Sequence, residues 1–140
     1  MPMQRLIRMA LAVTLVLGAL LLAANTLGSR SSAPPGGPIT GDVDRGRLLF
    51  ERAGCSACHT VTTEFRVGTG MAGVLQPQGP VYPSGIDYGG ALPNGAPRTE
   101  ENVAVFIRST NQGKIGLMPG RALTDQQMAD LLAYLRTLTR

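Results

Sequence analysis

The segment Cys55-Ser56-Ala57-Cys58-His59 constrains this chain more than any other feature, because two thiols three positions apart are followed at once by a histidine. This order and spacing are those of covalent haem attachment. Each thiol adds across one vinyl group of a haem to form a thioether, and the imidazole of His59 becomes an axial ligand of the iron. A short helical segment would point all three side chains at one haem face. We therefore predict that Cys55, Cys58 and His59 hold a haem.

The two cysteines also permit other interpretations. A thioredoxin-like redox pair needs a βαβ context, which the surrounding sequence does not show. A structural zinc site needs four ligands, whereas the chain offers two cysteines and one histidine. A structural disulfide between Cys55 and Cys58 stays open as an alternative. Because the motif occurs once and His59 is the only histidine, we predict a single haem without a second histidine ligand.

The N-terminal part is typical of a targeting or anchoring segment. Two arginines, Arg5 and Arg8, precede Met9–Ala24, an uncharged and almost wholly apolar run of sixteen residues. Such a run is either an export signal or an uncleaved anchor, and its last residues lack the small-residue pattern of a cleavage site. We predict that residues 1–28 anchor the chain in the cytoplasmic membrane, with the remainder on the periplasmic face. The alternative is a soluble periplasmic protein after cleavage.

Composition divides the rest of the chain into a linker and a domain. Residues 29–40 are rich in proline, glycine and serine and have little to bury, so we predict a linker. Residues 41–140 contain ten Arg or Lys and nine Asp or Glu. The net charge of +4 for the whole chain is therefore no argument for nucleic-acid binding. Aromatic residues are scarce in the domain, and a haem would supply apolar volume that its core lacks.

Three helices are predicted in the domain from their capping residues and apolar spacing. The first begins after Thr40 or Asp42, and the second after Thr99. The third begins at Thr124, which forms a capping box with Gln127.

Between the motif and the second helix, residues 63–98 hold eight glycines and five prolines. These residues interrupt regular structure, and an irregular stretch of this length is usually functional or disordered. We expect backbone there to wrap the edge of a haem.

Three methionines of the domain are candidates for the second axial ligand. Met71 lies only twelve residues past His59, and from there the opposite haem face needs a tight route. Met128 falls on the apolar stripe of the last helix, where a core position is expected. Met118 stands before Pro119, which restricts it to an extended conformation suited to an inward-projecting loop residue. We predict His59 and Met118 as the metal ligands. The open alternative is a five-coordinate iron with Met118 merely packed nearby, which would bind small gases.

From about residue 42 to residue 140 the sequence resembles the bacterial class I monohaem cytochromes c. The shared order is a first helix, the CxxCH motif, a methionine followed by proline, and a C-terminal helix. Gly46 and Phe50 match the glycine and aromatic residue of the family's first helix, and Tyr134-Leu135 matches the pair of its last helix. The resemblance implies an all-α class I cytochrome c fold, with helices packed around one covalently attached haem c and the terminal helices crossing closely.

The resemblance also implies contacts around the haem. A backbone carbonyl of a Gly-Pro turn holds the proximal imidazole in the family, and Gly79-Pro80 is the candidate here. Independently of the resemblance, Arg66, Arg98, Tyr82 and Tyr88 are candidate partners for the haem propionates, and a solvated loop position is the open alternative for each.

The function that follows is a one-electron carrier, not an enzyme, in a membrane-associated respiratory or photosynthetic electron-transfer chain. Its expected partners are redox proteins that donate and accept the electron. Two alternatives are a haem subunit of a larger oxidoreductase complex and a gas-binding haem sensor.

Overall fold

The computed structural model describes residues 38–140, and the first element within them is α2 (Val43–Arg52). Of the two predicted capping residues, Asp42 is the one used, since its carboxylate accepts the backbone N–H of Arg45 at 2.8 Å. The predicted membrane anchor and most of the predicted linker lie outside the described residues. None of the helices within residues 38–140 is long and apolar enough to cross a membrane.

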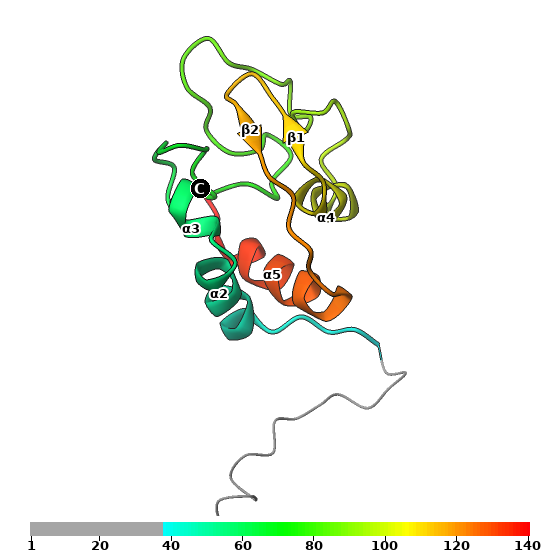
Figure 1. Cartoon of the computed structure of the whole chain (residues 1–140). Coiled ribbons are helices and arrows are strands. Elements are labelled where there is room, and N and C mark those ends of the chain that lie inside the picture. Colours follow the sequence, from blue (N-terminus) through cyan, green and yellow to red (C-terminus); the bar gives the residue numbers. More distant parts are fainter. Residues whose placement is uncertain (1–37) are drawn as a thin grey trace, which may run out of the picture. The chain divides into compact units, whose positions relative to one another are not determined.

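Four further elements and a short helix complete the domain (Figure 1). They are α3 (Cys55–Cys58), α4 (Glu100–Arg108), β1 (Asn111–Gln112), β2 (Leu117–Met118) and α5 (Asp125–Thr137). The predicted cap of α4 is confirmed, because Thr99 Oγ1 accepts the N–H of Asn102. The predicted capping box of α5 is confirmed too. Thr124 and Gln127 each accept the other's backbone N–H through their side chains, so both ends of the box satisfy donors that the first helical turn leaves open.

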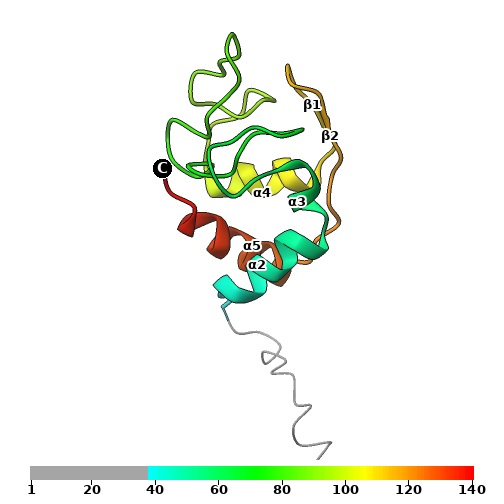
Figure 2. The same ribbon diagram turned by 90° about the vertical axis from the view of Figure 1, so that its left-hand side faces the viewer.

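Helices α2 and α5 lie against each other, with α2 crossing in front of α5 in Figure 2. Gly46 permits this approach. A Cβ there would overlap the backbone carbonyl of Asp130 and come within 2.8 Å of the Tyr134 Cβ. Phe50 and Tyr134 meet edge to face, with ring centroids 5.9 Å apart. The close crossing of the first and last helices at a glycine is therefore confirmed.

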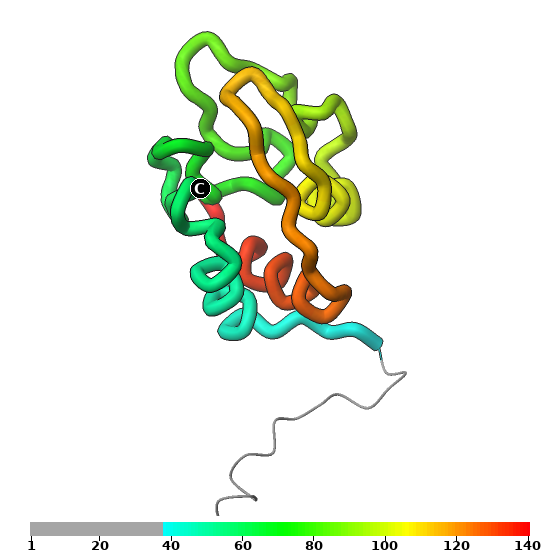
Figure 3. The backbone as a smooth tube through the Cα atoms, in the orientation of Figure 1, coloured from blue at the N-terminus to red at the C-terminus, as the bar shows by residue number. Residues whose placement is uncertain are grey.

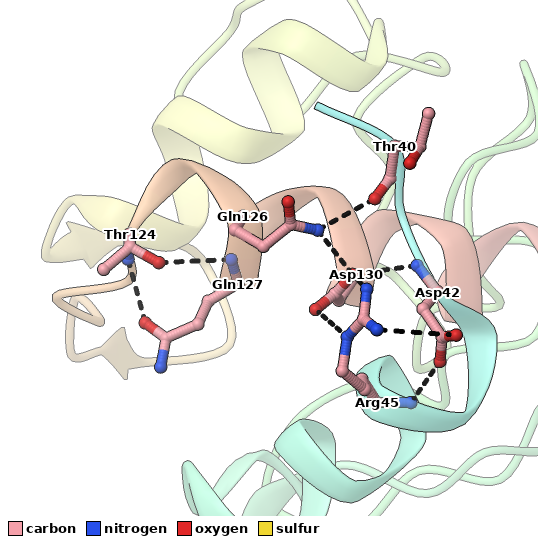
Figure 4. A network of polar contacts seen from close by, with 7 residues as sticks. All are labelled: Thr40, Asp42, Arg45, Thr124, Gln126, Gln127 and Asp130. Atoms are coloured by element: carbon pink, nitrogen blue, oxygen red, sulfur yellow. Dashed lines mark hydrogen bonds and ion pairs between the residues drawn. The ribbon is translucent and has the colours of Figure 1, made fainter. Parts of the chain in front are cut away.

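A polar cluster around the buried side chain of Asp130 reinforces the crossing (Figure 4). Asp130 Oδ1 accepts the backbone N–H of Asp42 at 2.8 Å and the side-chain amide of Gln126 at 2.9 Å, and Oδ2 accepts Nε of Arg45 at 2.9 Å. Gln126 also donates to the carbonyl of Thr40 at 2.8 Å. We call these residues, Thr40, Asp42, Arg45, Gln126 and Asp130, the Asp130 cluster. It fixes the segment before α2 onto α5.

The apolar core is built mainly from α4 and α5. Leu131 is its most deeply buried side chain, at 1% exposure, and Val103 and Ile107 of α4 are buried with it. Met128 belongs to the same core at 3% exposure, so its predicted packing role is confirmed.

A long irregular segment runs from the end of α3 to the start of α4, seen as the green to yellow-green tube in Figure 3. Residues 59–99 contain no helix or strand, which confirms the irregular structure predicted for 63–98. The order of this segment comes from scattered turns. Examples are the bonds from Met71 N–H to Thr60 O and from Leu92 N–H to Ala96 O, both at 2.9 Å.

One small sheet was not predicted. Strand β1 pairs antiparallel with β2, so Met118 lies opposite Asn111, and the turn is closed by Gly113 N–H bonding to Gly116 O at 3.0 Å. The predicted loop position of Met118 is therefore wrong in detail, although its expected extended backbone is present. Strands of two residues are too short to leave an alternating pattern in the sequence.

Candidate functional site

The four side chains predicted to hold a haem line a single cavity. Cys55 and Cys58 come from α3, His59 follows directly, and Met118 comes from β2. The other walls are mainly apolar and are contributed by α2, the irregular segment, α4 and α5 through Phe50, Met71, Leu92, Ile107, Leu131 and Leu135. The fold thus brings Cys55 and Met118, 63 positions apart in the sequence, to one apolar space.

The two thiols are half-buried and are not joined in a disulfide. Gly54, with φ +77°, turns the chain between α2 and α3 and so sets the direction in which α3 presents Cys55 and Cys58. Burial raises the pKa of the Cys55 thiol, and the nearby Arg121 guanidinium opposes part of this rise. Two unpaired thiols in the cavity wall are what thioether formation requires.

The orientation of His59 is set by a backbone carbonyl. His59 Nδ1 lies 2.8 Å from Thr69 O. A carbonyl only accepts, so Nδ1 carries the proton and Nε2 is the nitrogen left to bind a metal. Gly68 makes this placement possible, because a Cβ there would overlap Cε1 of His59.

The prediction that Gly79-Pro80 supplies the carbonyl for His59 is wrong. The chain returns to His59 much sooner, through a bond from Gly68 N–H to Cys58 O at 2.9 Å. Gly79, with φ +70°, packs instead against the guanidinium of Arg98. The sequence signal that marks the observed position is the pair of glycines, Gly68 and Gly70, on either side of Thr69.

Two methionines line the cavity, Met71 and Met118. Met71 is 8% exposed and lies two residues beyond the carbonyl that orients His59, on the same stretch of backbone. Met118 reaches the cavity from the β1–β2 hairpin instead. It is therefore the methionine that approaches from an element separate from the His59 loop.

The cavity wall also carries polar groups. Arg98, Tyr82 and Tyr88 line it, whereas Arg66 does not: its guanidinium donates to the carbonyl of Ser56 at 2.8 Å. Sequence reasoning missed one lining cation, Arg121. The sequence could have indicated Arg121, because it stands only three residues after Met118 in the same short segment.

The residues present fit a covalently bound haem. Two free thiols can form thioethers, the imidazole has one nitrogen fixed and the other available, and a thioether sulfur shares the same apolar space. A His/Met haem site requires this set of donors. Fold and site together define a helical domain of about 100 residues of the haem-binding class.

Comparison with known proteins agrees with this class. The profile of the cytochrome c family matches residues 43–139, so the chain belongs to the cytochrome c family. A protein of Synechocystis sp. (strain ATCC 27184 / PCC 6803 / Kazusa), described as cytochrome c-553-like, is 30% identical over 100 residues, or 71% of this chain and 72% of that protein. The predicted class I c-type cytochrome fold is confirmed. The family implies a covalently bound c-type haem and electron transfer.

Proposed function

We propose that this chain is a single-haem, one-electron carrier, with haem c attached through Cys55 and Cys58 and its iron bound by His59 and Met118. The observation that carries the proposal is the shared cavity, which all four side chains line. Membership of the cytochrome c family supports the electron-transfer role.

Each part of the cavity has a task in such a carrier. A bound haem supplies one-electron exchange between ferric and ferrous iron. Thr69 keeps His59 in one tautomer and one orientation through the 2.8 Å bond to Nδ1. With a haem bound, the soft sulfur of Met118 would stabilise ferrous iron and so raise the potential. The apolar walls would limit the access of water to His59 and Met118 with a haem bound, which favours the same ligands in both oxidation states.

The proposed setting is the periplasmic face of the cytoplasmic membrane, within a respiratory or photosynthetic chain. The apolar run Met9–Ala24 behind two arginines supports it. Redox proteins would donate and accept the electron. The intact mass and N-terminal sequence of the purified protein would count the haems and show whether the segment before residue 29 is kept or removed. A stable large assembly on native separation would identify a subunit of an oxidoreductase complex instead of a free carrier.

The axial ligand is tested with two matched substitutions, Met118→Leu and Met71→Leu, because both side chains line the cavity. We expect only Met118→Leu to abolish the near-infrared sulfur-to-iron charge-transfer band of the ferric protein and to lower the midpoint potential. Loss of the band only in Met71→Leu would assign the ligand to Met71. A band absent from the wild type, with rapid carbon monoxide binding after reduction, would favour the gas-sensor alternative.

A further inference from the structure

Met118 is carried by a hairpin that is fixed to the fold at its base. At the base Asn111 pairs with Met118, and the side-chain amide of Asn111 donates to the carbonyl of Phe106, in the last turn of α4, at 2.6 Å. Beyond Met118, the N–H of Arg121 donates to the carbonyl of Ile107 at 2.8 Å. Both ends of the hairpin are therefore tied to α4, and in Figure 1 its turn points away from that helix.

The turn of the hairpin has little packing of its own. None of residues 111–120 is buried, and Leu117 is 63% exposed. A pair of short strands is at best marginally stable without contacts to other elements. The position of the turn therefore depends on the residues that it contacts outside the hairpin.

The turn is joined to the irregular segment through Lys114. Its backbone N–H donates to the Tyr88 hydroxyl at 2.8 Å, and its ammonium donates to the carbonyl of Asp87 at 3.0 Å. The ammonium also lies 5.2 Å from the centre of the Tyr88 ring, within the range of a cation–π contact. Within residues 38–140, these are the hydrogen bonds that residues 112–117 make outside the hairpin. We call Tyr88 and Lys114 the hairpin latch.

The Tyr88 side of the latch is itself held in place. The Tyr88 ring packs against Tyr82, with ring centroids 4.9 Å apart, and the Tyr88 carbonyl accepts the N–H of Ala91 at 3.0 Å. The hairpin comes so close that a Cβ on Gly113 would lie 3.1 Å from the Tyr88 hydroxyl oxygen. The acceptor that Lys114 uses therefore has a defined position on the irregular segment.

The latch lies in the wall of the candidate haem cavity. Tyr88 lines this cavity, and so do Gly113, Ile115 and Met118 of the hairpin. Met118 stands only four residues after Lys114. Movement of the turn away from Tyr88 would therefore open this wall and withdraw Met118 from the cavity.

We propose that Tyr88 and Lys114 are positioning residues for Met118: they hold the hairpin turn against the irregular segment and so oppose replacement of the Met118 sulfur by a small external ligand. The inference rests on the proposed function and extends it to what keeps an electron carrier from binding other ligands. A ligand that replaces Met118 binds only the form with the latch open. Its apparent affinity is therefore reduced by the fraction of molecules in which the latch is closed.

The test is the dissociation constant of imidazole for the ferric holoprotein, followed by loss of the sulfur-to-iron band in Tyr88→Phe and Tyr82→Phe. Tyr82→Phe is the matched control, because the hydroxyl that it removes accepts from Arg98 and not from the hairpin. We expect imidazole to bind about fivefold more tightly to Tyr88→Phe, the factor that one hydrogen bond of ordinary strength supplies. Its affinity for Tyr82→Phe should equal that of the wild type.

Lys114→Met separates the two parts of the latch. It keeps the backbone N–H that bonds to Tyr88 and removes the ammonium with its bond to Asp87. We expect imidazole affinity to rise only about twofold in this exposed position. An affinity equal to that of the wild type would overturn the role of the ammonium.

Hydrogen exchange reports the latch without an external ligand. The Lys114 amide should exchange slowly in the wild-type holoprotein and much faster in Tyr88→Phe, whereas the Arg121 amide, bonded to Ile107, should be unchanged. If the variant does not fold, the wild type alone decides. Saturating imidazole should speed exchange of the Lys114 amide and not of the Arg121 amide. An unprotected Lys114 amide in the wild type would overturn the proposal.

The outcomes separate this inference from the proposed function. Imidazole affinity that is unchanged in Tyr88→Phe, or raised equally in Tyr82→Phe, would overturn the latch and leave the proposed function standing. A wild-type protein without covalent haem would overturn both.

Discussion

The crossing of α2 and α5 and the irregular segment between α3 and α4 are held together in different ways. The crossing has capped helices, a close contact at Gly46 and the Asp130 cluster, all made by the protein's own groups. Residues 59–99 have no helix or strand, and many of their apolar side chains line the cavity. We therefore expect the crossing to be stabilised largely by the chain itself, although Phe50, Leu131 and Leu135 also line the cavity. Residues 59–99 are expected to depend more on a group bound there.

Removing the attachment thiols should produce the largest difference between these two regions. Cys55→Ala with Cys58→Ala should abolish covalent haem completely, so that acidic organic solvent extracts all of it. Hydrogen exchange should then accelerate across residues 59–99 far more than in α2 and α5, because the loop loses its packing partner. Ser56→Ala, inside the motif but without a thiol, is the control. Covalent haem in the double variant, or equal deprotection of both regions, would contradict this prediction.

Gly46→Ala tests the packing of α2 against α5 at their crossing. The added Cβ would overlap the Asp130 carbonyl, so α2 must move away from α5. We expect a loss of about 3 kcal/mol in the free energy of unfolding, measured by denaturant titration of the holoprotein. Arg47→Ala is the control on the same helix, because it removes only an exposed ion pair with Glu51, worth about 0.3–0.5 kcal/mol. Similar losses in both variants would show that the helices do not pack closely at Gly46.

Asp130→Asn tests the polar part of the same crossing. Burial raises the Asp130 pKa, but hydrogen bonds from Arg45, the Asp42 backbone and Gln126 outweigh it and hold the pKa below its usual value. A depressed pKa in the folded state stabilises the protein above the unfolded pKa of about 3.9, and this stabilisation is lost as pH falls through the folded value. We expect Asp130→Asn to cost about 1–3 kcal/mol at pH 7.

The pH series of the same variant supplies its check. The difference in unfolding free energy between wild type and Asp130→Asn should shrink as pH falls below about 4. A constant difference from pH 7 to pH 3 would mean that the carboxylate charge does not contribute.

Glu100→Gln should have the smallest effect. Arg136 Nε donates to Glu100 Oε1 at 2.6 Å, linking α4 to α5, and this hydrogen bond lowers the Glu100 pKa. Both side chains are about half exposed, so we expect a loss of only about 0.5 kcal/mol at pH 7, less at high salt. As for Asp130, a lowered folded pKa means that the contribution disappears in acid. A loss above about 2 kcal/mol would show that this pair carries more of the contact between the helices than its exposure suggests.

The sequence predicted the features that depend on neighbouring residues and missed those that depend on tertiary contacts. Thr99 and the Thr124–Gln127 box were identifiable because capping depends on residues three positions apart. The haem motif is equally local. The carbonyl partner of His59 was not identifiable, since Thr69 reaches it through a loop route set by tertiary hydrogen bonds. Asp130 was overlooked for a related reason. A lone acidic residue in a helix is usually solvated. Only the position of Asp130 between Ala129 and Leu131, in an apolar run, indicates that it is buried.

The Asp130 cluster has a practical consequence for protein engineering. Thr40 and Asp42 precede α2, yet their backbone groups bond to α5, and Gly41 between them leaves no room for a Cβ beside the Ala129 carbonyl. A shortened version of the protein that keeps these bonds therefore has to begin no later than Thr40, before α2. A tag or fusion partner joined upstream of that point leaves these bonds in place. Trimming to Val43 removes both the Thr40 and the Asp42 hydrogen bonds to α5.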